Sequence, residues 1–158
     1  MAGNKISFDE KKKPVVVAHV LHHFVTGGLE NGVSNIINNL PKGKYRHIII
    51  CITDYDLDFY KRITTGNVEI YQLNKIKGKS YKWLFDIWNL LQKIKPDICH
   101  TRNLGAIEAQ LSAFLARVPY RIHGEHGWDV NDLGGCNKKY QLLRRIFKPF
   151  IHQYVALS

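Results

Sequence analysis

The stretch VVVAHVLHHFVTGGLENGVSNIINNL, residues 15–40, decides the fold class. Its apolar, β-branched start predicts a buried strand at Val15–Leu21, and residues 33–40 then show the i, i+3, i+4, i+7 apolar spacing of a helix. Two glycines, Gly27 and Gly28, lie between the strand and the helix. Glycines at such a junction permit either a tight turn or the close approach of a bulky group to the backbone.

The same alternation continues along the chain. Further strands are predicted at His47–Thr53, Val68–Leu73, Asp97–Thr101, Arg121–His123 and Tyr154–Leu157. Helices are predicted at 84–94, 107–115 and 140–150, with a weaker short helix at 58–63. Alternating helices and nearly continuous apolar strands predict an α/β fold, a Rossmann-like, doubly wound parallel sheet of about six strands.

Length and composition fit a single folded domain at residues 15–158. The chain has 158 residues, of which 45% are hydrophobic, enough to bury a core. Residues 1–14 predict a frayed or disordered tail without an apolar signal segment. No apolar stretch reaches the roughly 20 residues of a bilayer span, and the three cysteines lack metal-ligand spacing. We therefore expect a cytoplasmic protein, free in solution or peripheral at the inner membrane face.

The charge balance predicts an anionic partner. Lys and Arg number 23 against 13 Asp and Glu, a net charge of +10, although a lysine-rich source would give the same excess. In the helix at 140–150, one side is apolar (Tyr140, Leu143, Ile146, Phe147, Phe150) and the other basic (Lys138, Arg144, Arg145, Lys148). The basic side predicts contact with an anionic membrane; a solvated helix surface is the alternative.

Polar segments follow four of the predicted strands. They are HHFVTGGLE at 22–30, Thr53–Asp58, HTRN at 100–103 and HGEHGWDVNDLGG at 123–135. Ligands of such sheets bind beyond the carboxyl ends of the strands, near a topological switch point. The four segments therefore predict a single site at that edge.

Gly27, Gly28 and Glu30 begin the first helix. Its free N–H groups and partial positive charge suit a phosphate or another anion. Glu30 favourably opposes the helix dipole and is also a candidate ligand contact. A strand–helix turn with nothing bound is the alternative.

Five histidines lie at or just beyond predicted strand ends: His22, His23, His100, His123 and His126. We find neither a metal-binding spacing such as H-E-x-x-H nor a nucleophile elbow. Binding and charge stabilisation are therefore the expected chemistry.

The segment at 124–135 is long for a connection in this fold class, and long ordered loops are usually functional. Glu125, Asp129 and Asp132 are candidate acceptors for sugar hydroxyls, and Trp128 is a candidate stacking surface for a sugar. The alternative is that the acids are solvated and that Trp128 covers the core.

Three segments carry a family resemblance. TGGLENGVSNIINNL at 26–40, PDICHTRNLGAIEAQ at 96–110 and the sequence from Arg121 to VALS at the end resemble the amino-terminal domain of glycosyltransferase family 4. The nearest similarity is to the exopolysaccharide-associated sugar transferases, over about residues 15–158.

The resemblance implies one half of a GT-B fold, on the acceptor side, with a second, donor-binding domain absent from this chain. It implies metal-independent, retaining transfer of a sugar from a nucleotide-diphosphate donor to a glycan or lipid-linked acceptor, with no cofactor. His126 matches the family histidine beside the transferred sugar, and His100 and Arg102 match the polar end of the fourth strand. Gly27, Gly28, Glu30, Glu125, Trp128 and Asp129 complete the predicted substrate- or diphosphate-binding set.

Two other classes of function stay open from the residues alone. One is a nucleotide- or NAD-binding enzyme domain, although G-x-G-x-x-G is not met and Asp54 lies beyond the usual spacing of the ribose-binding acid. The other is a non-catalytic basic interaction module. No nucleic-acid recognition motif is found, so no nucleic-acid partner is expected.

Overall fold

The computed structural model describes residues 13–66, 68–76, 78, 81–126, 132 and 135–157. Residues 1–12 of the predicted tail lie outside the described residues, as do Trp128 and Asp129.

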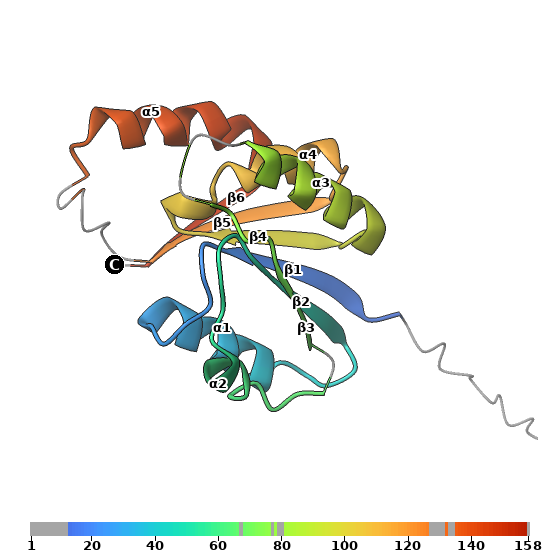
Figure 1. Ribbon diagram of the computed structural model, residues 1–158. Helices are drawn as coiled ribbons and strands as arrows, with labels where there is room; N and C mark the ends of the chain where they lie inside the picture. Colours follow the sequence, from blue (N-terminus) through green and yellow to red (C-terminus); the bar gives the residue numbers. More distant parts are fainter. Residues whose placement is uncertain are drawn as a thin grey trace, which may run out of the picture.

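A parallel sheet of six strands forms the centre of the molecule (Figure 1). The strands are β1 Val15–Leu21, β2 Tyr45–Cys51, β3 Val68–Gln72, β4 Ile98–Arg102, β5 Tyr120–His126 and β6 Gln153–Leu157. Their spatial order is β3-β2-β1-β4-β5-β6. The chain thus winds outward from β1 in one direction and returns to β4 to continue in the other, which places the switch point between β1 and β4.

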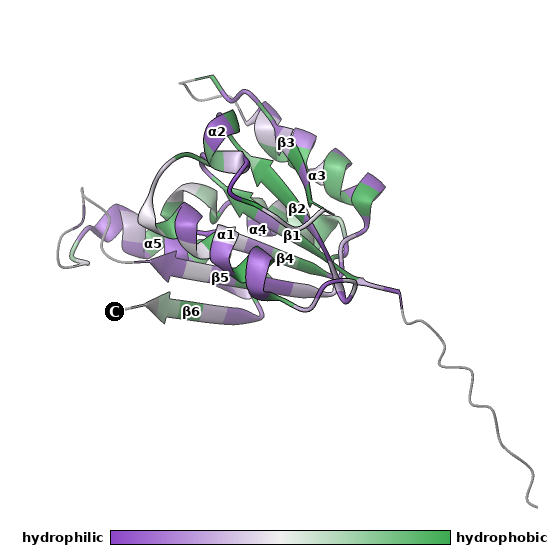
Figure 2. Cartoon of the chain, turned by 90° about the horizontal axis from the view of Figure 1, so that it is seen from below, coloured by the Kyte–Doolittle hydropathy of each residue, from purple (hydrophilic) through white to green (hydrophobic). Residues whose placement is uncertain are grey.

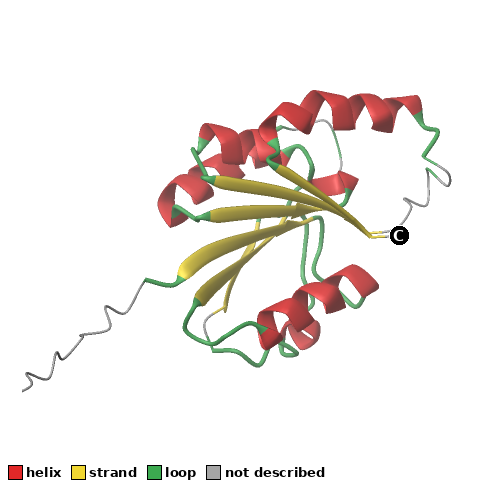
Figure 3. Cartoon of the chain, turned by 180° about the vertical axis from the view of Figure 1, so that it is seen from behind, coloured by secondary structure: helices red, strands yellow, loops and turns green. Residues whose placement is uncertain are grey.

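Helices cover both faces of the sheet. They are α1 Gly28–Asn39, α2 Leu57–Tyr60, α3 Lys82–Ile94, α4 Ala109–Leu115 and α5 Lys138–Phe147, with single 3-10 turns η1 Leu104–Ala106 and η2 Lys148–Phe150. Figures 1 and 3 show α1 and α2 below the sheet and α3, α4 and α5 above it. This arrangement confirms the predicted Rossmann-like, doubly wound α/β fold.

The two faces of the sheet have separate cores because successive strand side chains alternate between faces. Ile48, Ile50 and Ile52 pack towards α3 and α4, whereas Ile49 and Cys51 pack with residues of α1 and α2. In Figure 2 the central strands carry hydrophobic colouring, and β5 carries hydrophilic segments. No helix within the described residues is long and apolar enough to cross a bilayer.

Most element boundaries differ from the predictions by one to three residues, and two of the differences have a clear structural reason. β5 extends from Tyr120 to His126, beyond the predicted Arg121–His123, because its ladder with β6 continues through His126 opposite Leu157. Helix α4 begins at Ala109 rather than 107, because the chain first forms η1. The short helix predicted at 58–63 is α2, whose first N–H groups are capped by the Asp56 carboxylate.

The orientation of α5 agrees with the prediction except at two residues. Tyr140, Leu143 and Phe150 pack around Phe147 as predicted. Ile146, predicted on the apolar side, is 52% exposed, and Leu142 is 57% exposed. Phe147 is buried, and Arg144, predicted on the basic side, forms ion pairs beneath the helix. The buried side of α5 therefore matches the predicted apolar side, except that it leaves Ile146 exposed and includes Arg144, which its ion pairs hold against the sheet.

Shortening a core side chain should test this layer arrangement. Leu91 of α3 is fully buried in the α3/α4 core, so Leu91→Ala should lower the free energy of unfolding by about 2–5 kcal/mol. The control Leu142→Ala shortens an exposed leucine of α5 and should change it by no more than about 0.5 kcal/mol. Urea unfolding followed by circular dichroism measures both free energies. Equal losses in the two variants would contradict a core between the sheet and α3.

Candidate functional site

The carboxyl ends of β1, β4 and β5 meet beside the switch point. β1 pairs with β4 with His19 opposite His100, and β4 pairs with β5 with Arg102 opposite Gly124. The segment after β1 lies next to the segment after β4, since a Cβ on Gly105 would lie 3.5 Å from the ring of His22. The segment after β2 also lies there, since the Phe24 N–H donates to the Asp54 carbonyl at 3.1 Å. All four predicted polar segments thus reach one edge of the sheet.

Arg102 joins two of the predicted histidines. Its Nη1 lies 3.0 Å from Nε2 of His126, and its Nη2 lies 3.3 Å from Nδ1 of His100. A guanidinium only donates hydrogen bonds, so both imidazole nitrogens accept. His126 therefore carries its proton on Nδ1 and His100 on Nε2.

The charge of Arg102 is buried. The residue is 3% exposed, its Nε has no hydrogen-bond partner among the described residues, and no described carboxylate lies within ion-pair distance of it. Burial lowers the pKa of Arg102 to about 10, so the group stays cationic at neutral pH. A buried cation without an acidic partner is costly, and this corner of the sheet therefore favours an electron-rich ligand.

Burial and the Arg102 charge keep the neighbouring imidazoles neutral. The pKa of His100 falls to about 3, first through burial and then through Arg102. The pKa of His126 is lowered by burial, then by Arg102 and His123. At neutral pH these side chains offer directed hydrogen bonds rather than positive charge.

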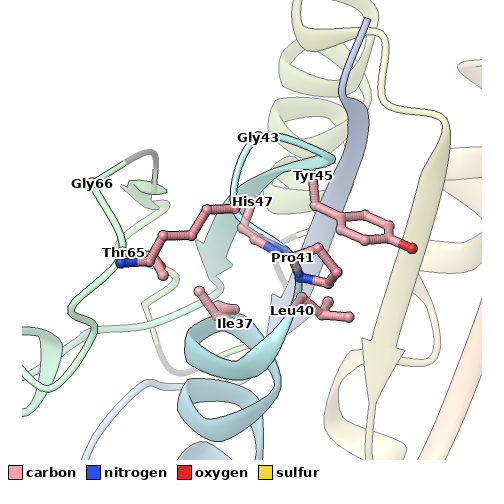
Figure 4. Close-up of a pocket in the computed structure, with 9 residues that line it drawn as sticks. Ile37, Leu40, Pro41, Gly43, Tyr45, His47, Thr65 and Gly66 are labelled. Carbon is pink, nitrogen blue, oxygen red and sulfur yellow. The ribbon is translucent and has the colours of Figure 1, made fainter. Parts of the chain in front are cut away.

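Two histidines that the sequence analysis did not select extend this cluster across the sheet. His19 Nε2 lies 3.1 Å from His47 Nδ1, and both residues are buried. The ring centre of His19 lies 6.2 Å from that of His100. His47 and Tyr45 also line a cavity of about 130 Å³ at the opposite, amino edge of the sheet (Figure 4). The sequence signal for the pair is a histidine inside each of two apolar strands.

The missing side chain of Gly27 leaves room for the carboxylate of Glu30. It caps α1 in an extended conformation with φ −165°, and neither it nor Gly28 has a positive φ. A Cβ on Gly27 would overlap Oε2 of Glu30, whose carboxylate folds back over the helix start, 3.5 Å from Nε2 of His23. The space around Gly28 is open, so Gly28 is the position where a ligand can approach the backbone.

Glu125 lies apart from His126, on the other face of β5. Arg144 holds both its oxygens, with Nε to Oε1 at 2.7 Å and Nη2 to Oε2 at 2.8 Å. The nearby His123 ring, whose Nε2 lies 3.6 Å from Oε1, and then Arg144 lower the pKa of Glu125 to about 2, against a desolvation cost. Asp132 lies 3.6 Å from Arg144 and accepts from the Asn137 N–H. These contacts fasten α5 to the sheet; the role of Glu125 towards a ligand stays a prediction.

His123 is part of a buried polar network. Its Nδ1 lies 2.8 Å from Thr101 Oγ1, which accepts from Gln110 Nε2 at 2.7 Å. His123 is fully buried, which gives it a structural place away from His126. Within the described part of the chain, no three His, Cys, Asp or Glu residues are grouped so that they could hold a metal ion.

The chain is similar to a known family of proteins. The model of the family Glycosyltransferase Family 4 matches residues 26–158. A comparison with curated protein sequences gives no significant match.

Similar solved structures include UDP-GlcNAc 2-epimerase from Methanocaldococcus jannaschii, with TM-score 0.59, 17% identity, and coverage of 91% of this chain and 40% of that one. UDP-N-acetylglucosamine 2-epimerase from Rickettsia bellii gives TM-score 0.58 and 14% identity, covering 92% of this chain and 39% of that one. These similarities support the fold, and the chain spans about two fifths of each structure's length.

The neutral histidines predict that acid destabilises the fold. Burial lowers the pKa of His19, His47 and His100 below 6.5, so below that pH the unfolded chain binds more protons than the folded one. The stability is fully present above pH 6.5 and is lost as the pH falls towards about 3, where His100 titrates. Urea unfolding between about pH 7.5 and about pH 5 avoids most carboxyl titration.

The variant His100→Gln should reduce the slope of the free energy of unfolding against pH. The control His23→Gln, at a half-exposed histidine, should leave that slope unchanged. A slope unchanged in His100→Gln would show that His100 does not contribute.

Proposed function

Because the chain belongs to glycosyltransferase family 4, we propose that it is the acceptor-side half of a retaining, metal-independent glycosyltransferase of GT-B architecture. The enzyme would move a sugar from a nucleotide-diphosphate donor to a glycan or lipid-linked acceptor in exopolysaccharide biosynthesis. The observation that carries the proposal is the buried Arg102 with its two imidazoles at the switch point. It offers hydrogen bonds and positive potential where such folds bind ligands.

A nucleotide sugar is the proposed donor. The names of the similar solved structures state that they act on UDP-N-acetylglucosamine, which supports this substrate class. Residues that grip the nucleotide and diphosphate would belong to a second domain. We therefore expect the present chain alone to bind substrate weakly and not to transfer sugar.

His126 would act as a hydrogen-bond donor at the transferred sugar. During transfer the bond from the anomeric carbon to the diphosphate oxygen would break, the acceptor oxygen would bond to the same carbon, and the acceptor's proton would pass to an oxygen of the departing diphosphate. Negative charge develops on the departing diphosphate, and preorganised donors stabilise such charge. Arg102 holds Nε2 of His126, so that Nδ1–H is the donor left for a ligand, and the guanidinium charge strengthens it.

The other predicted residues would surround this donor. Gly28 gives open space at the start of α1, where the backbone can approach a phosphate or sugar. Glu30 neutralises part of the helix dipole and would limit the charge of the group bound there. His100 supports Arg102 from beneath. Trp128 and Asp129 remain proposed sugar contacts.

The NAD-binding alternative gains no specific support. The Asp54 carboxylate accepts a hydrogen bond from Thr53 Oγ1 at 2.7 Å, and the glycine spacing of a dinucleotide fingerprint is missing from the sequence.

Replacing His126 in the complete enzyme tests the proposal. His126→Ala should lower kcat by about a hundredfold, because one preorganised donor is removed, and should leave the melting temperature nearly unchanged. The control His152→Ala removes a histidine whose ring bonds Arg121 near the amino edge. It should lower the melting temperature and leave kcat intact. Assays with a panel of nucleotide sugars measure both; normal turnover by His126→Ala would refute the role.

We also propose that α5 brings the enzyme to an anionic membrane that holds a lipid-linked acceptor. The segment 138–150 contains no acidic residue, and its exposed basic residues are Lys138, Lys139, Arg145 and Lys148. The exposed Leu142 and Ile146, one turn apart, lie among them. Basic residues near such a surface contribute about 1 kcal/mol each, and exposed apolar side chains add shallow insertion.

Vesicle co-sedimentation with and without anionic lipid tests this contact. Arg145→Glu with Lys148→Glu should weaken binding to anionic vesicles at least about tenfold. The control Lys44→Glu with Lys93→Glu makes the same charge change on other exposed lysines and should have a smaller effect. Equal losses in both variants would mean that net charge rather than α5 drives binding. Absence of binding at low salt would remove the membrane proposal.

A further inference from the structure

The residue after Arg102 has an unusual backbone. Asn103 has φ 56° and ψ 165°, a combination that glycine adopts freely and that is strained for other residues. Lys95, another non-glycine residue with positive φ, has ψ 59° and lies in the left-handed helical region at the end of α3, an ordinary helix terminus. The conformation of Asn103 therefore needs its own explanation.

Two hydrogen bonds join Asn103 to β5. Its N–H donates to the Gly124 carbonyl at 2.7 Å, and its side-chain Oδ1 accepts from the His126 N–H at 2.8 Å. Asn103 thus continues the contact of β4 with β5 one residue beyond the strand, and its carbonyl then begins η1 by accepting from Ala106 N–H. The strained backbone turns the chain into η1 while the side chain stays on β5.

A gain in stability does not account for asparagine rather than glycine at position 103. The residue is exposed, and the small net contribution of one hydrogen bond does not exceed the cost of the strained backbone. Glycine would adopt the same φ and ψ freely and keep the N–H bond to Gly124. What asparagine adds over glycine is the contact with the His126 N–H.

Gly124 completes the arrangement from the other side. A Cβ at this position would lie 3.0 Å from His100 Nε2 and 3.2 Å from His126 Nε2, closer than side chains normally pack. The missing side chain lets both imidazoles approach Arg102. Asn103 fixes the main chain of His126, and Gly124 leaves room for its ring.

We infer that Asn103 and Gly124 are positioning residues that hold His126 in the orientation and tautomer imposed by Arg102. The inference deepens the proposed function and rests on it only for what His126 does to a substrate. For the chain without ligand it states two things. The His126 ring is held with its proton on Nδ1, and Asn103 is required to hold it so.

Nitrogen NMR of the histidine rings in this chain, without ligand, provides the test. In the unmodified chain His126 should show predominantly the Nδ1–H form and a pKa below the ordinary histidine value. Asn103→Gly should retain the melting temperature, but His126 should become a mixture of both tautomers with a pKa closer to the ordinary value. Asn103→Asp, which keeps an acceptor oxygen, should restore the Nδ1–H form.

The matched control is Asn74→Gly. Asn74 is also exposed with positive φ, and its side chain accepts from Gln72, away from β5. This variant should leave His126 unchanged. Gly124→Ala should produce the same tautomer mixture as Asn103→Gly by a different route, steric displacement of the ring.

Two results would overturn the inference. One is an unchanged His126 tautomer in Asn103→Gly; the other is a clearly larger loss of melting temperature in Asn103→Gly than in Asn74→Gly, which would make Asn103 a structural residue. Neither result depends on sugar transfer. Conversely, an inactive complete enzyme would refute the proposed function and leave the NMR result standing.

Discussion

The positive charge of Arg102, buried at the end of β4, is the constraint on which the candidate site depends. No described acid lies beside it, and two of its three guanidinium nitrogens donate to lone pairs of His100 and His126. That contact fixes the protonated nitrogen of both rings, and burial followed by the Arg102 charge keeps their pKa values low. A single buried cation thus converts two histidines from potential acids into oriented neutral donors.

Because strand side chains alternate between faces, β5 places the candidate site and a packing network on opposite faces of the sheet. His123 and Glu125 face α5, where they join Thr101 and Arg144 in a polar network. Gly124 and His126 face the other way, towards Arg102. Neighbouring residues of one short motif therefore belong to different layers of the molecule. The network behind the sheet holds the strand that carries His126.

The sequence predicted the fold class and the edge of the sheet that carries the polar segments, because apolar periodicity and the position of strand ends are local properties. It also predicted His100, Arg102 and His126 as residues of one edge. It did not predict that Glu125 pairs with Arg144, since the alternation could be assigned only after β5 was known to extend to His126. The sequence correctly placed most of the apolar side of α5 against the core. It wrongly included Ile146 and wrongly put Arg144 on the basic side, because hydropathy does not reveal the ion pair of Arg144 with Glu125.

The order of strands in the sheet also affects the order in which strands can pair during folding. The central pair, β1 and β4, joins residues about eighty positions apart, as in the bond from the Val16 N–H to the Asp97 carboxylate. Parallel pairing over such separations is slow because a long loop must close first. During synthesis, β1, β2 and β3 can assemble with α1 before β4 has left the ribosome, leaving one side of β1 as an open edge. The later half of the chain must therefore pair with this edge before another molecule does. Unpaired strand edges are prone to aggregation during this interval, when chaperones protect nascent chains.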